Sequence, residues 1–572
     1  MIRRRPDTWG SDWRDDGAKW LGGRMRIAGK WVGVVCAAQM LAVSAGAASC
    51  SAVKEHVPGP AETAYLAADY EKAAGLYRDA LAAAPGDEQA RAALVRVLLR
   101  EQKVADAGAV VAEGLAKTPG SAVLLTARAE VELREGEPWV AAQTASEAFK
   151  ADACLPRLHL VVAEMCGLNS RYKTEKDEIE LAHRLDPWDA DIRGEWIGTL
   201  PLPERVKEMR KYLAGQTGDD AEDRRHEEMA LADMSKRLGE PHPPCRLVST
   251  ASETEIPFLR LMYDATHTRA FGLEVKLNDH RASLEIDTGA GGILVSRSVA
   301  QHAGLMPFSD TDVGGIGDEG SSKGYRAFAE SIKVGNLEFQ NCMVEVMGGK
   351  HPLDIDGLIG MDVFSKFLVT LDYPGRKLAL SGLPARPGEV ATAPTLGSYE
   401  DDEEETQPTV AGTGLSVKTV TKGPYDRYVG PEMQGYTAVY RRGHMLMLPV
   451  ALNMSKVKLF ILDTGAWATT VSPAAGREVT KVHGDDSLHV KGLNGEVKKA
   501  YVADEVTFTF AKIAQKIQGV PSFDTSEVSK NVGLEISGFL GARTLELTTI
   551  HIDYRDGLVK FDFDPKRVKR VP

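Results

Sequence analysis

Two kinds of hydrophobic pattern divide the chain. From about residue 61 to 191 the sequence is alanine-rich and of helical character, with no alternation of apolar and polar positions. From about residue 253 onward, short apolar and β-branched runs, such as 284–286 and 460–462, are separated by glycine and turn residues. Short runs of this kind are typical of strands. The pattern predicts an all-α N-terminal region followed by an all-β region.

The helical region carries a period of 34 residues. Pro85, Pro119 and Pro187 fall on a 34-residue grid whose remaining member is Ala153, and small residues such as Ala73 precede the grid positions. This period resembles tetratricopeptide repeats, in which paired helices stack into a solenoid that can hold a protein partner. We therefore expect helical repeats over 60–200, and a charged helical connector over 201–250 that contains a proline cluster. A generic helical bundle is the alternative.

The β-rich region contains an internal duplication. The tetrapeptide Asp-Thr-Gly-Ala occurs at 287–290 and again at 463–466, each time directly after an apolar run. Each copy is followed by a hydrophobic-hydrophobic-Gly motif, at 358–360 and 539–541, and then by two closing strands joined by a turn. Two copies in the same order indicate two related β-units, because a single short motif would carry little weight.

These motifs resemble the retropepsin-like aspartic proteases, here with two lobes in one chain. The resemblance implies all-β lobes over 253–384 and 436–567, after a leader over 1–49 and the helical repeats. Between the lobes, residues 385–435 hold several prolines and the run Asp-Asp-Glu-Glu-Glu at 401–405. Such a composition cannot bury a core, so a flexible acidic linker is expected.

The repeated tetrapeptide supplies the chemistry of this family. Two carboxylates that share one proton can activate a water molecule for peptide hydrolysis, and Asp287 and Asp463 are the candidates. The residues expected to support the pair are Thr288, Gly289, Thr464 and Gly465. Glycine allows the two backbones to approach closely, and the resemblance implies that the threonine hydroxyls lock the two turns together. A lone Asp-Thr-Gly could instead be a turn aspartate that caps its own backbone.

Two further features shape the expected cleft. Ala290 and Ala466 offer no hydroxyl to the carboxylates, so the pKa values of the pair should be high. By resemblance to the retroviral type, the enzyme is expected to be active at mildly acidic to neutral pH. Glycine-rich hairpin tips between the motifs fit flaps that close over substrate, with surface hairpins as the alternative. The expected flap residues are Gly315, Ile316, Gly317, Gly492, Leu493 and Asn494. Trp467 in the second lobe stands where the first has Gly291.

The N-terminus has the pattern of an export signal. Arg24, Arg26 and Lys30 precede an uncharged stretch that ends in small residues, and translation is expected to start at Met25. Cleavage after the small residues and lipidation of Cys50 as a membrane tether are both open, as is an uncleaved anchor. The location would be the periplasm or the cell surface. Six cysteines are present, but their pairing does not follow from the sequence.

Charge and composition narrow the partners. A net charge of −12 and no basic patch with interleaved aromatics predict no nucleic-acid partner. The histidines form no metal-ligand pattern, so no metal or cofactor is expected. The hypothesis is an exported aspartic endopeptidase that acts on polypeptides, with repeats that recruit substrate or a protein partner. The alternative is a catalytically inactive, peptide-binding scaffold with a protease fold.

Overall fold

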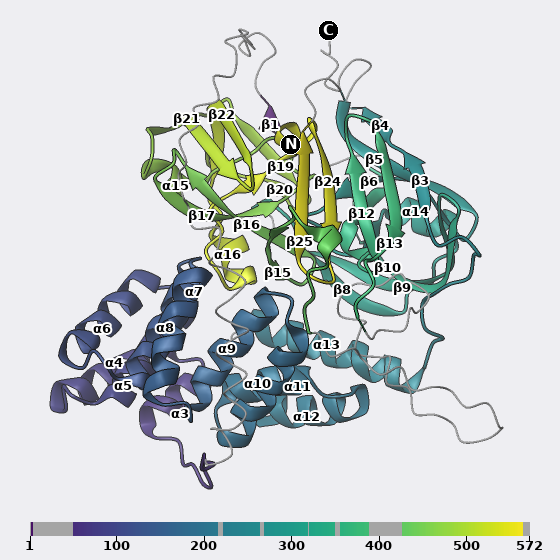
Figure 1. The fold of residues 1–572 in the computed structure, drawn as a ribbon. Coiled ribbons are helices and arrows are strands. Elements are labelled where there is room, and N and C mark those ends of the chain that lie inside the picture. Colours follow the sequence, from purple (N-terminus) through teal and green to yellow (C-terminus); the bar gives the residue numbers. More distant parts are fainter. Residues whose placement is uncertain are drawn as a thin grey trace.

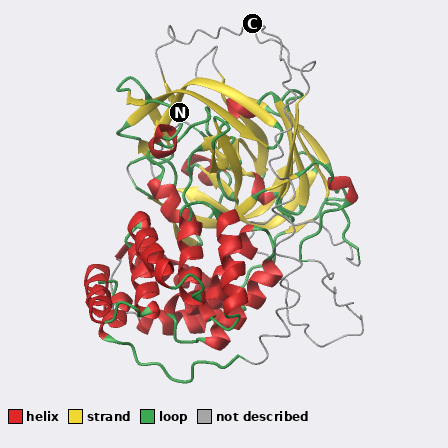
Figure 2. Cartoon of the chain, turned by 60° about the vertical axis from the view of Figure 1, so that its left-hand side comes forward, coloured by secondary structure: helices red, strands yellow, loops and turns green. Residues whose placement is uncertain are grey.

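The structure, a computed structural model, places a layer of helices against two β-lobes (Figure 1). It describes residues 2–3, 50–215, 221–262, 268–318, 320–348, 355–387 and 426–563. Figure 2 shows most of the helices gathered on one side of the molecule and the strands, with a few short helices among them, on the other. The predicted fold class, helical repeats followed by two all-β lobes, is confirmed. The expected leader over 1–49 lies almost wholly outside the described residues.

The helices recur with the predicted period. The first helix of successive pairs starts at Glu88, Ala122, Pro156 and Ala190, which are 34 residues apart. The helices are α3 (Pro60–Leu66), α4 (Tyr70–Ala83), α5 (Glu88–Arg100), α6 (Val104–Lys117), α7 (Ala122–Arg134), α8 (Pro138–Ala151), α9 (Pro156–Leu168), α10 (Tyr172–Leu185), α11 (Ala190–Gly198), α12 (Leu202–Gly215) and α13 (Ala221–Gly239). Each grid residue therefore lies three positions before the first residue of a helix. Between them, directly before the helix, side chains such as Asp87 and Ser121 cap the helix N-terminus.

Charged side chains tie these helices to one another. The Arg157 guanidinium binds Glu130 of α7 at 2.9 Å, and binds Asp189 at 2.9 Å and Asp191 at 3.0 Å at the start of α11. Arg96 also reaches Asp189, at 3.2 Å. These charges are largely buried, and they balance one another rather than standing open to a ligand.

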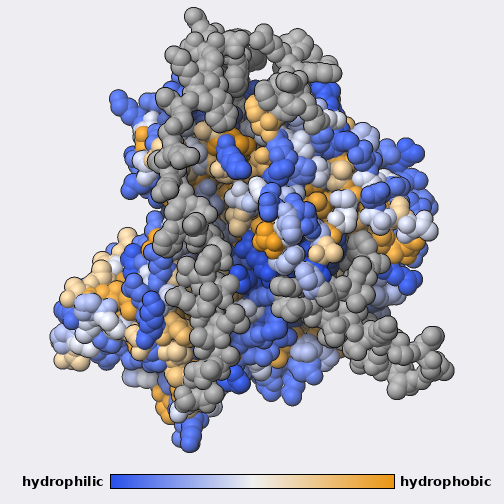
Figure 3. All heavy atoms as spheres, viewed as in Figure 1, coloured by the Kyte–Doolittle hydropathy of each residue, from blue (hydrophilic) through white to orange (hydrophobic). Residues whose placement is uncertain are grey.

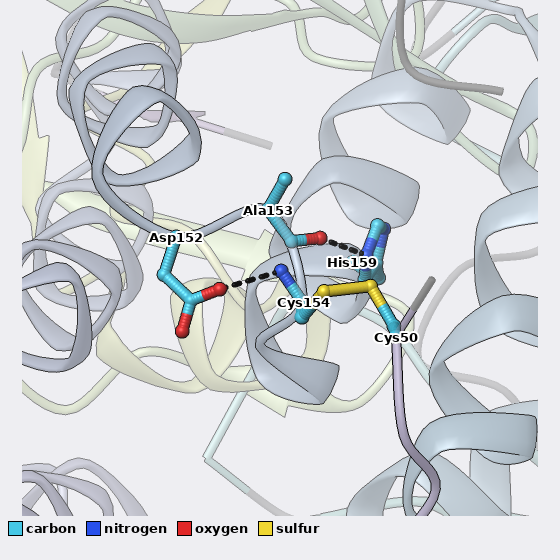
Figure 4. The surroundings of a disulfide bond; sticks show 5 residues. All are labelled: Cys50, Asp152, Ala153, Cys154 and His159. Carbon is cyan, nitrogen blue, oxygen red and sulfur yellow. Dashed lines mark hydrogen bonds between the residues drawn. A yellow bond between two sulfur atoms is a disulfide. The ribbon is translucent and has the colours of Figure 1, made fainter. Parts of the chain in front are cut away.

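A disulfide fixes the segment before the first helix. Cys50 is bonded to Cys154 in the loop between α8 and α9, as Figure 4 shows. In the same loop Asp152 accepts the Cys154 N–H at 2.8 Å, and the His159 ring contacts the Ala153 carbonyl at 2.9 Å. The covalent link closes a loop of 104 residues, which restricts the unfolded chain.

Lobe 1 is built on a nine-stranded sheet. Its strands are β2 (Arg246–Leu247), β4 (Leu259–Met262), β5 (Thr268–Leu277), β6 (His280–Asp287), β7 (Ile293–Val295), β8 (Ser309–Val313), β9 (Ser322–Val334), β10 (Leu337–Met347) and β11 (Gly357–Gly360). The short helices α14 (Arg297–His302) and η4 (Met361–Val363) complete it. β11 pairs in parallel with β6 and antiparallel with β7, so it lies between them beside the first Asp-Thr-Gly.

Lobe 2 repeats this plan. Its strands are β15 (Tyr440–Arg442), β16 (Met445–Leu452), β17 (Lys456–Leu462), β18 (Val482–Gly484), β21 (Ala500–Phe510), β22 (Ile513–Phe523) and β23 (Phe539–Leu540). A small sheet joins β1 (Ile2–Arg3), β19 (His489–Gly492) and β20 (Gly495–Glu496). The helices are η6 (Pro431–Met433), α15 (Pro473–Arg477), α16 (Ser526–Val532) and α17 (Ala542–Leu545). β23 pairs in parallel with β17, as β11 does with β6.

The closing strands of the two lobes join in one sheet. Its order is β14 (Thr437–Ala438), β25 (Leu558–Phe563), β24 (Thr548–Asp553), β12 (Phe367–Asp372), β13 (Lys377–Gly382) and β3 (Thr254–Pro257). At its centre β12 and β24 pair antiparallel, with Thr370 opposite His551. The duplicated strands thus meet each other, and this sheet relates the lobes by a pseudo-two-fold axis.

The helices dock on both lobes. Buried side chains of α7, α8 and α9 share one hydrophobic cluster with Tyr440 and Met447 of lobe 2. Arg442 of β15 binds Glu164 of α9 at 2.8 Å. On the other lobe, the buried Asp233 of α13 binds Arg326 of β9 at 3.2 Å. The helical region therefore supports the lobes as part of one molecule.

Two expected boundaries differ from the structure. The connector over 201–250 is helical only to Gly239; Cys245 is bonded to Cys342 of β10, and β2 pairs with the same strand. The end of the linker over 385–435 is also ordered, because Asp426 accepts the N–H groups of Lys173 and Thr174 at the start of α10, at 2.9 and 3.1 Å. The remainder of the linker, residues 388–425, lies outside the described residues.

The surface gives a mixed picture. On the face in Figure 3, hydrophilic and hydrophobic residues are interspersed over the helices and both lobes. Within the described ranges, no helix has both the length and the apolar character that crossing a membrane requires.

Candidate active site

The two Asp-Thr-Gly turns meet at the junction of the lobes within one chain. Asp287 is the last residue of β6, and Asp463 follows β17 directly. Each carboxylate accepts a backbone N–H of its own turn: Gly289 donates to Asp287 Oδ1 at 2.8 Å, and Ala466 donates to Asp463 Oδ1 at 2.9 Å. These bonds hold each side chain in the turn that presents it.

The threonines bind the two turns together in a reciprocal way. The Thr288 hydroxyl donates to the Leu462 carbonyl at 2.7 Å and accepts the Thr464 N–H at 3.0 Å. The Thr464 hydroxyl donates to the Ile286 carbonyl at 3.1 Å and accepts the Thr288 N–H at 3.0 Å. Both threonines are buried. All four groups are satisfied across the junction, which fixes the relative position of the turns.

The glycines allow the carboxylates to lie together. A Cβ atom added at Gly289 would be 2.9 Å from Cγ of Asp463, and one added at Gly465 would be 2.4 Å from Cγ of Asp287. Each carboxylate therefore rests against the glycine of the opposite turn. Any larger residue at either position would push the two carboxylates apart.

Burial and mutual repulsion change the ionisation of the pair. Burial raises the pKa of Asp287 above its usual range. Burial and then the charge of Asp287 raise the pKa of Asp463 well above its usual range. Because the charge of one carboxylate opposes ionisation of the other, the arrangement disfavours the doubly ionised pair. The direction agrees with the expectation drawn from Ala290 and Ala466, but burial is the leading cause.

The expected flap residues of the two lobes contact each other. The Asn494 N–H donates to the Ile316 carbonyl at 3.0 Å. A Cβ atom at Gly317 would be 2.0 Å from the Asn494 carbonyl oxygen, and one at Gly492 would be 2.2 Å from the Ile316 carbonyl oxygen. Leu493 and Ala290 both pack against one small apolar cluster, and Ile316 and Ala466 both pack against the larger cluster that lobe 2 shares with the helices. The two tips therefore touch each other.

The structure adds two residues that the sequence did not single out. His444, between β15 and β16 of lobe 2, places Nε2 3.2 Å from the Gly289 carbonyl, and its ring fills the space beside Gly291. Asp362 of η4 is buried and accepts the Gly292 N–H at 3.1 Å. Burial raises the pKa of Asp362. Neither residue lies in a local motif, since His444 is 155 positions from its partner.

The second turn is braced by its own lobe. The N–H groups of Ala542 and Arg543 in α17 donate to the carbonyls of Ala466 and Trp467, at 2.7 and 3.1 Å. The Arg543 guanidinium lies 5.8 Å from the centre of the Trp467 ring. In lobe 1, the His444 ring of the opposite lobe fills the space beside Gly291. In lobe 2, Trp467 stands at the equivalent position and supplies a ring itself.

The described side chains include no group of three or more histidine, cysteine, aspartate or glutamate residues that could hold a metal ion. The chemistry that this arrangement can perform is that of a buried carboxyl pair with one shared proton, which can take a proton from water and give one to a leaving group.

Comparison with protein families identifies both regions. Residues 273–363 match the aspartyl protease model, and residues 64–131 match a tetratricopeptide repeat model. The chain therefore carries a retropepsin-like aspartyl protease domain in lobe 1 and tetratricopeptide-like repeats before it. Lobe 2 has the same Asp-Thr-Gly motif and the same strand arrangement as lobe 1, and it is therefore a second retropepsin-like lobe.

Individual relatives match only part of the chain. It is 27% identical over 149 residues to DNA damage-inducible protein 1 of Chaetomium globosum, covering 26% of this chain and 33% of that protein. It is 24% identical over 166 residues to the UBA domain-containing protein Mud1 of Schizosaccharomyces pombe, covering 27% of this chain and 46% of that protein. The chain thus spans less than half the length of these relatives. A solved retropepsin-like aspartic protease from Rickettsia conorii is 24% identical, covers 24% of this chain and 94% of its own, and has a TM-score of 0.18.

Proposed function

We propose that the chain is an exported aspartic endopeptidase that hydrolyses polypeptides through the Asp287/Asp463 dyad. The observation that carries the proposal is the meeting of both Asp-Thr-Gly turns in one chain, with each carboxylate against the opposite glycine. The threonine bonds that hold this geometry are complete on both sides.

The reaction would use the shared proton of the pair. The ionised carboxylate removes a proton from a water molecule as that water attacks the peptide carbonyl, and the protonated partner gives its proton to the reacting oxygen or the leaving amine. The raised pKa values favour retention of a proton by the pair. The flap tips at Ile316 and Leu493 would exclude bulk water and hold an extended substrate by strand addition.

The helical repeats would recruit substrate or a protein partner. Arg157, Asp189 and Asp191 bind one another, so these charges do not by themselves mark the recruiting surface. Export is supported by the disulfides Cys50–Cys154 and Cys245–Cys342, since such bonds persist in oxidising compartments. A sulfur in a disulfide carries no lipid, so a tether through Cys50 would require the first bond to be absent.

The test is cleavage by the purified full chain. Denatured protein substrate is incubated from mildly acidic to neutral pH, with and without a statine-type inhibitor that mimics the tetrahedral intermediate. The proposal predicts inhibitor-sensitive cleavage that both Asp287→Asn and Asp463→Asn remove. Binding of the substrate without cleavage at any pH would favour the inactive scaffold. Intact-mass measurement of the exported protein decides between a disulfide and a lipid at Cys50.

A further inference from the structure

We propose that His444 of lobe 2 is a positioning residue for the Asp-Thr-Gly turn of lobe 1, where it braces the backbone after Asp287. The proposal rests on the proposed peptidase function and adds a residue and a direction of support to it. His444 acts through Gly289 and Gly291 and does not touch the water or the substrate.

A single residue, Gly289, links His444 to the Asp287 carboxylate. Its Nε2 lies 3.2 Å from the Gly289 carbonyl oxygen, and the N–H of the same Gly289 donates to Asp287 Oδ1 at 2.8 Å. The two peptide groups that flank Gly289 are therefore both engaged, one by the histidine and the other by the Asp287 carboxylate. A shift of this glycine by a few tenths of an ångström would move the hydrogen bond that orients Asp287.

The ring also controls the shape of the turn. A Cβ atom at Gly291 would be 2.7 Å from Nδ1 and 3.0 Å from Cγ of His444. The imidazole thus lies directly against the Gly291 backbone. On the far side of the turn, Gly292 donates to the buried Asp362 at 3.1 Å. His444 and Asp362 together restrain residues 289–292 from both lobes.

The hairpin that carries His444 is itself firmly held. Arg441 is buried, and its guanidinium donates to the carbonyls of Gly443, at 2.8 Å, and Tyr554. Arg442 donates to the Val532 carbonyl at 3.1 Å and binds Glu164 of α9 at 2.8 Å. Tyr440 packs in the hydrophobic cluster of the helical region. The histidine therefore projects from a rigid support, as a preorganised site requires.

The electrostatic interaction with His444 acts in the same direction on two carboxyl groups. Burial raises the pKa of both Asp287 and Asp362, and the interaction with His444 opposes this rise in each case. The other ionisable groups that interact with these carboxyls include Asp463 of the pair, Arg441, Tyr554, Glu285 and Tyr373. For Asp463 the largest causes of the raised pKa are burial and the charge of Asp287.

Three variants of the full chain separate geometry from charge. His444→Ala removes both the hydrogen bond to Gly289 and the ionisable ring, whereas His444→Gln keeps an N–H donor without the ionisable ring. His483→Ala is the matched control, because His483 lies on the outer strand β18 with its side chain 58% exposed. The measurements are kcat, KM and the pH profile on a peptide substrate, and calorimetric binding of the statine-type inhibitor over the same pH range.

We expect His444→Ala to lower kcat about 10-fold with little change in KM, since it removes orientation of a catalytic group. Its acid limb should move to higher pH, because the variant loses the electrostatic interaction with His444 that lowers the pKa of Asp287. His444→Gln should recover most of kcat at the optimum but keep the shifted limb. The control should match the wild type.

Other outcomes overturn the proposal in distinguishable ways. If the wild type cleaves and His444→Ala keeps its kcat and acid limb, the positioning role is wrong and the peptidase function stands. If both His444 variants lose activity equally, with an unmoved limb and a lowered melting temperature, the histidine is only structural. A wild type that neither cleaves nor binds the inhibitor overturns the peptidase function and this role together.

Discussion

The two lobes share their Asp-Thr-Gly turns but differ in what supports those turns. Thr288 and Thr464 form the same bonds in both directions across the junction. Beyond the turns, lobe 1 is contacted by His444 from the opposite lobe, whereas lobe 2 is braced by its own Arg543 and Trp467. The threonine bonds between the turns are symmetric, and the side chains that support each turn are not.

The helical region explains part of this difference. The β15–β16 hairpin of lobe 2 packs on the helices through Tyr440 and Met447, so its tip is held at a fixed place above lobe 1. Lobe 1 meets the helices on another surface, through Asp233 of α13 and Arg326. A duplicated fold thus gains unequal support for its two turns from unequal docking, while the Asp-Thr-Gly turns themselves stay the same.

The largest expected effect breaks the symmetric part. Asp287→Asn and Asp463→Asn should each lower kcat by about 10³-fold or more, because each carboxyl is half of one acid-base pair. Turnover is measured together with the molecular mass of each variant. A variant that keeps about half of the wild-type activity in a dimeric particle would show that the lobes pair between chains.

The threonine bonds give the next effect. Thr288→Val would leave the Thr464 N–H and the Leu462 carbonyl buried without their partner, at a cost of about 2–4 kcal/mol in the free energy of unfolding. Thr464→Val should cost the same within about 1 kcal/mol, and Thr288→Ser, which keeps the hydroxyl, much less. Urea unfolding measures all three, and clearly unequal costs for the two valine variants would contradict the symmetry.

A smaller effect is expected at the asymmetric contact between Gly291 and His444. Gly291→Ala would place a methyl group against the His444 ring, and we expect a loss of about 1–3 kcal/mol in the free energy of unfolding. Adding His444→Ala in the same chain should restore most of that loss, which a double-mutant cycle measures. Additive costs would mean that the ring and Gly291 are not in contact.

The smallest effect concerns pH and stability. Burial raises the pKa of Asp463 well above the ordinary 3.8, so the folded state favours the protonated pair. That contribution is complete below pH 3.8 and is lost as pH rises through the raised folded pKa, by at most about 1.4 kcal/mol per pH unit for one proton. Unfolding from mildly acidic to neutral pH should show a shallower slope for Asp463→Asn than for the wild type. An unchanged slope would mean that the pair takes up no proton on folding.

Local patterns predicted much of the architecture. The 34-residue period of the sequence recurs in the starts of α5, α7, α9 and α11, because helix pairs of fixed length must repeat in the sequence as they do in space. The closing strands were visible as short apolar runs before a turn. The strand β2 was not, since its two residues are held by Cys342 and β10 rather than by their own pattern.

The candidate site divides in the same way. Asp287 and Asp463 could be named because one tetrapeptide carries both the carboxylate and the glycine that admits its partner. His444 and Asp362 could not, because their roles depend on contacts with Gly289 and Gly292 that only the folded chain creates. Gly291 stands at the position in lobe 1 that Trp467 holds in lobe 2. The absence of a side chain there was the one sign in the sequence that another group fills the space beside the first turn.

The most direct test of the account is the number of active sites per chain. Titration of the full chain with a tight statine-type inhibitor, followed by activity and combined with the mass in solution, counts the sites. The account predicts one inhibitor per monomeric chain, because Asp287 and Asp463 form a single pair. One inhibitor for every two chains, two for each, or no inhibitor-sensitive activity at all would contradict it.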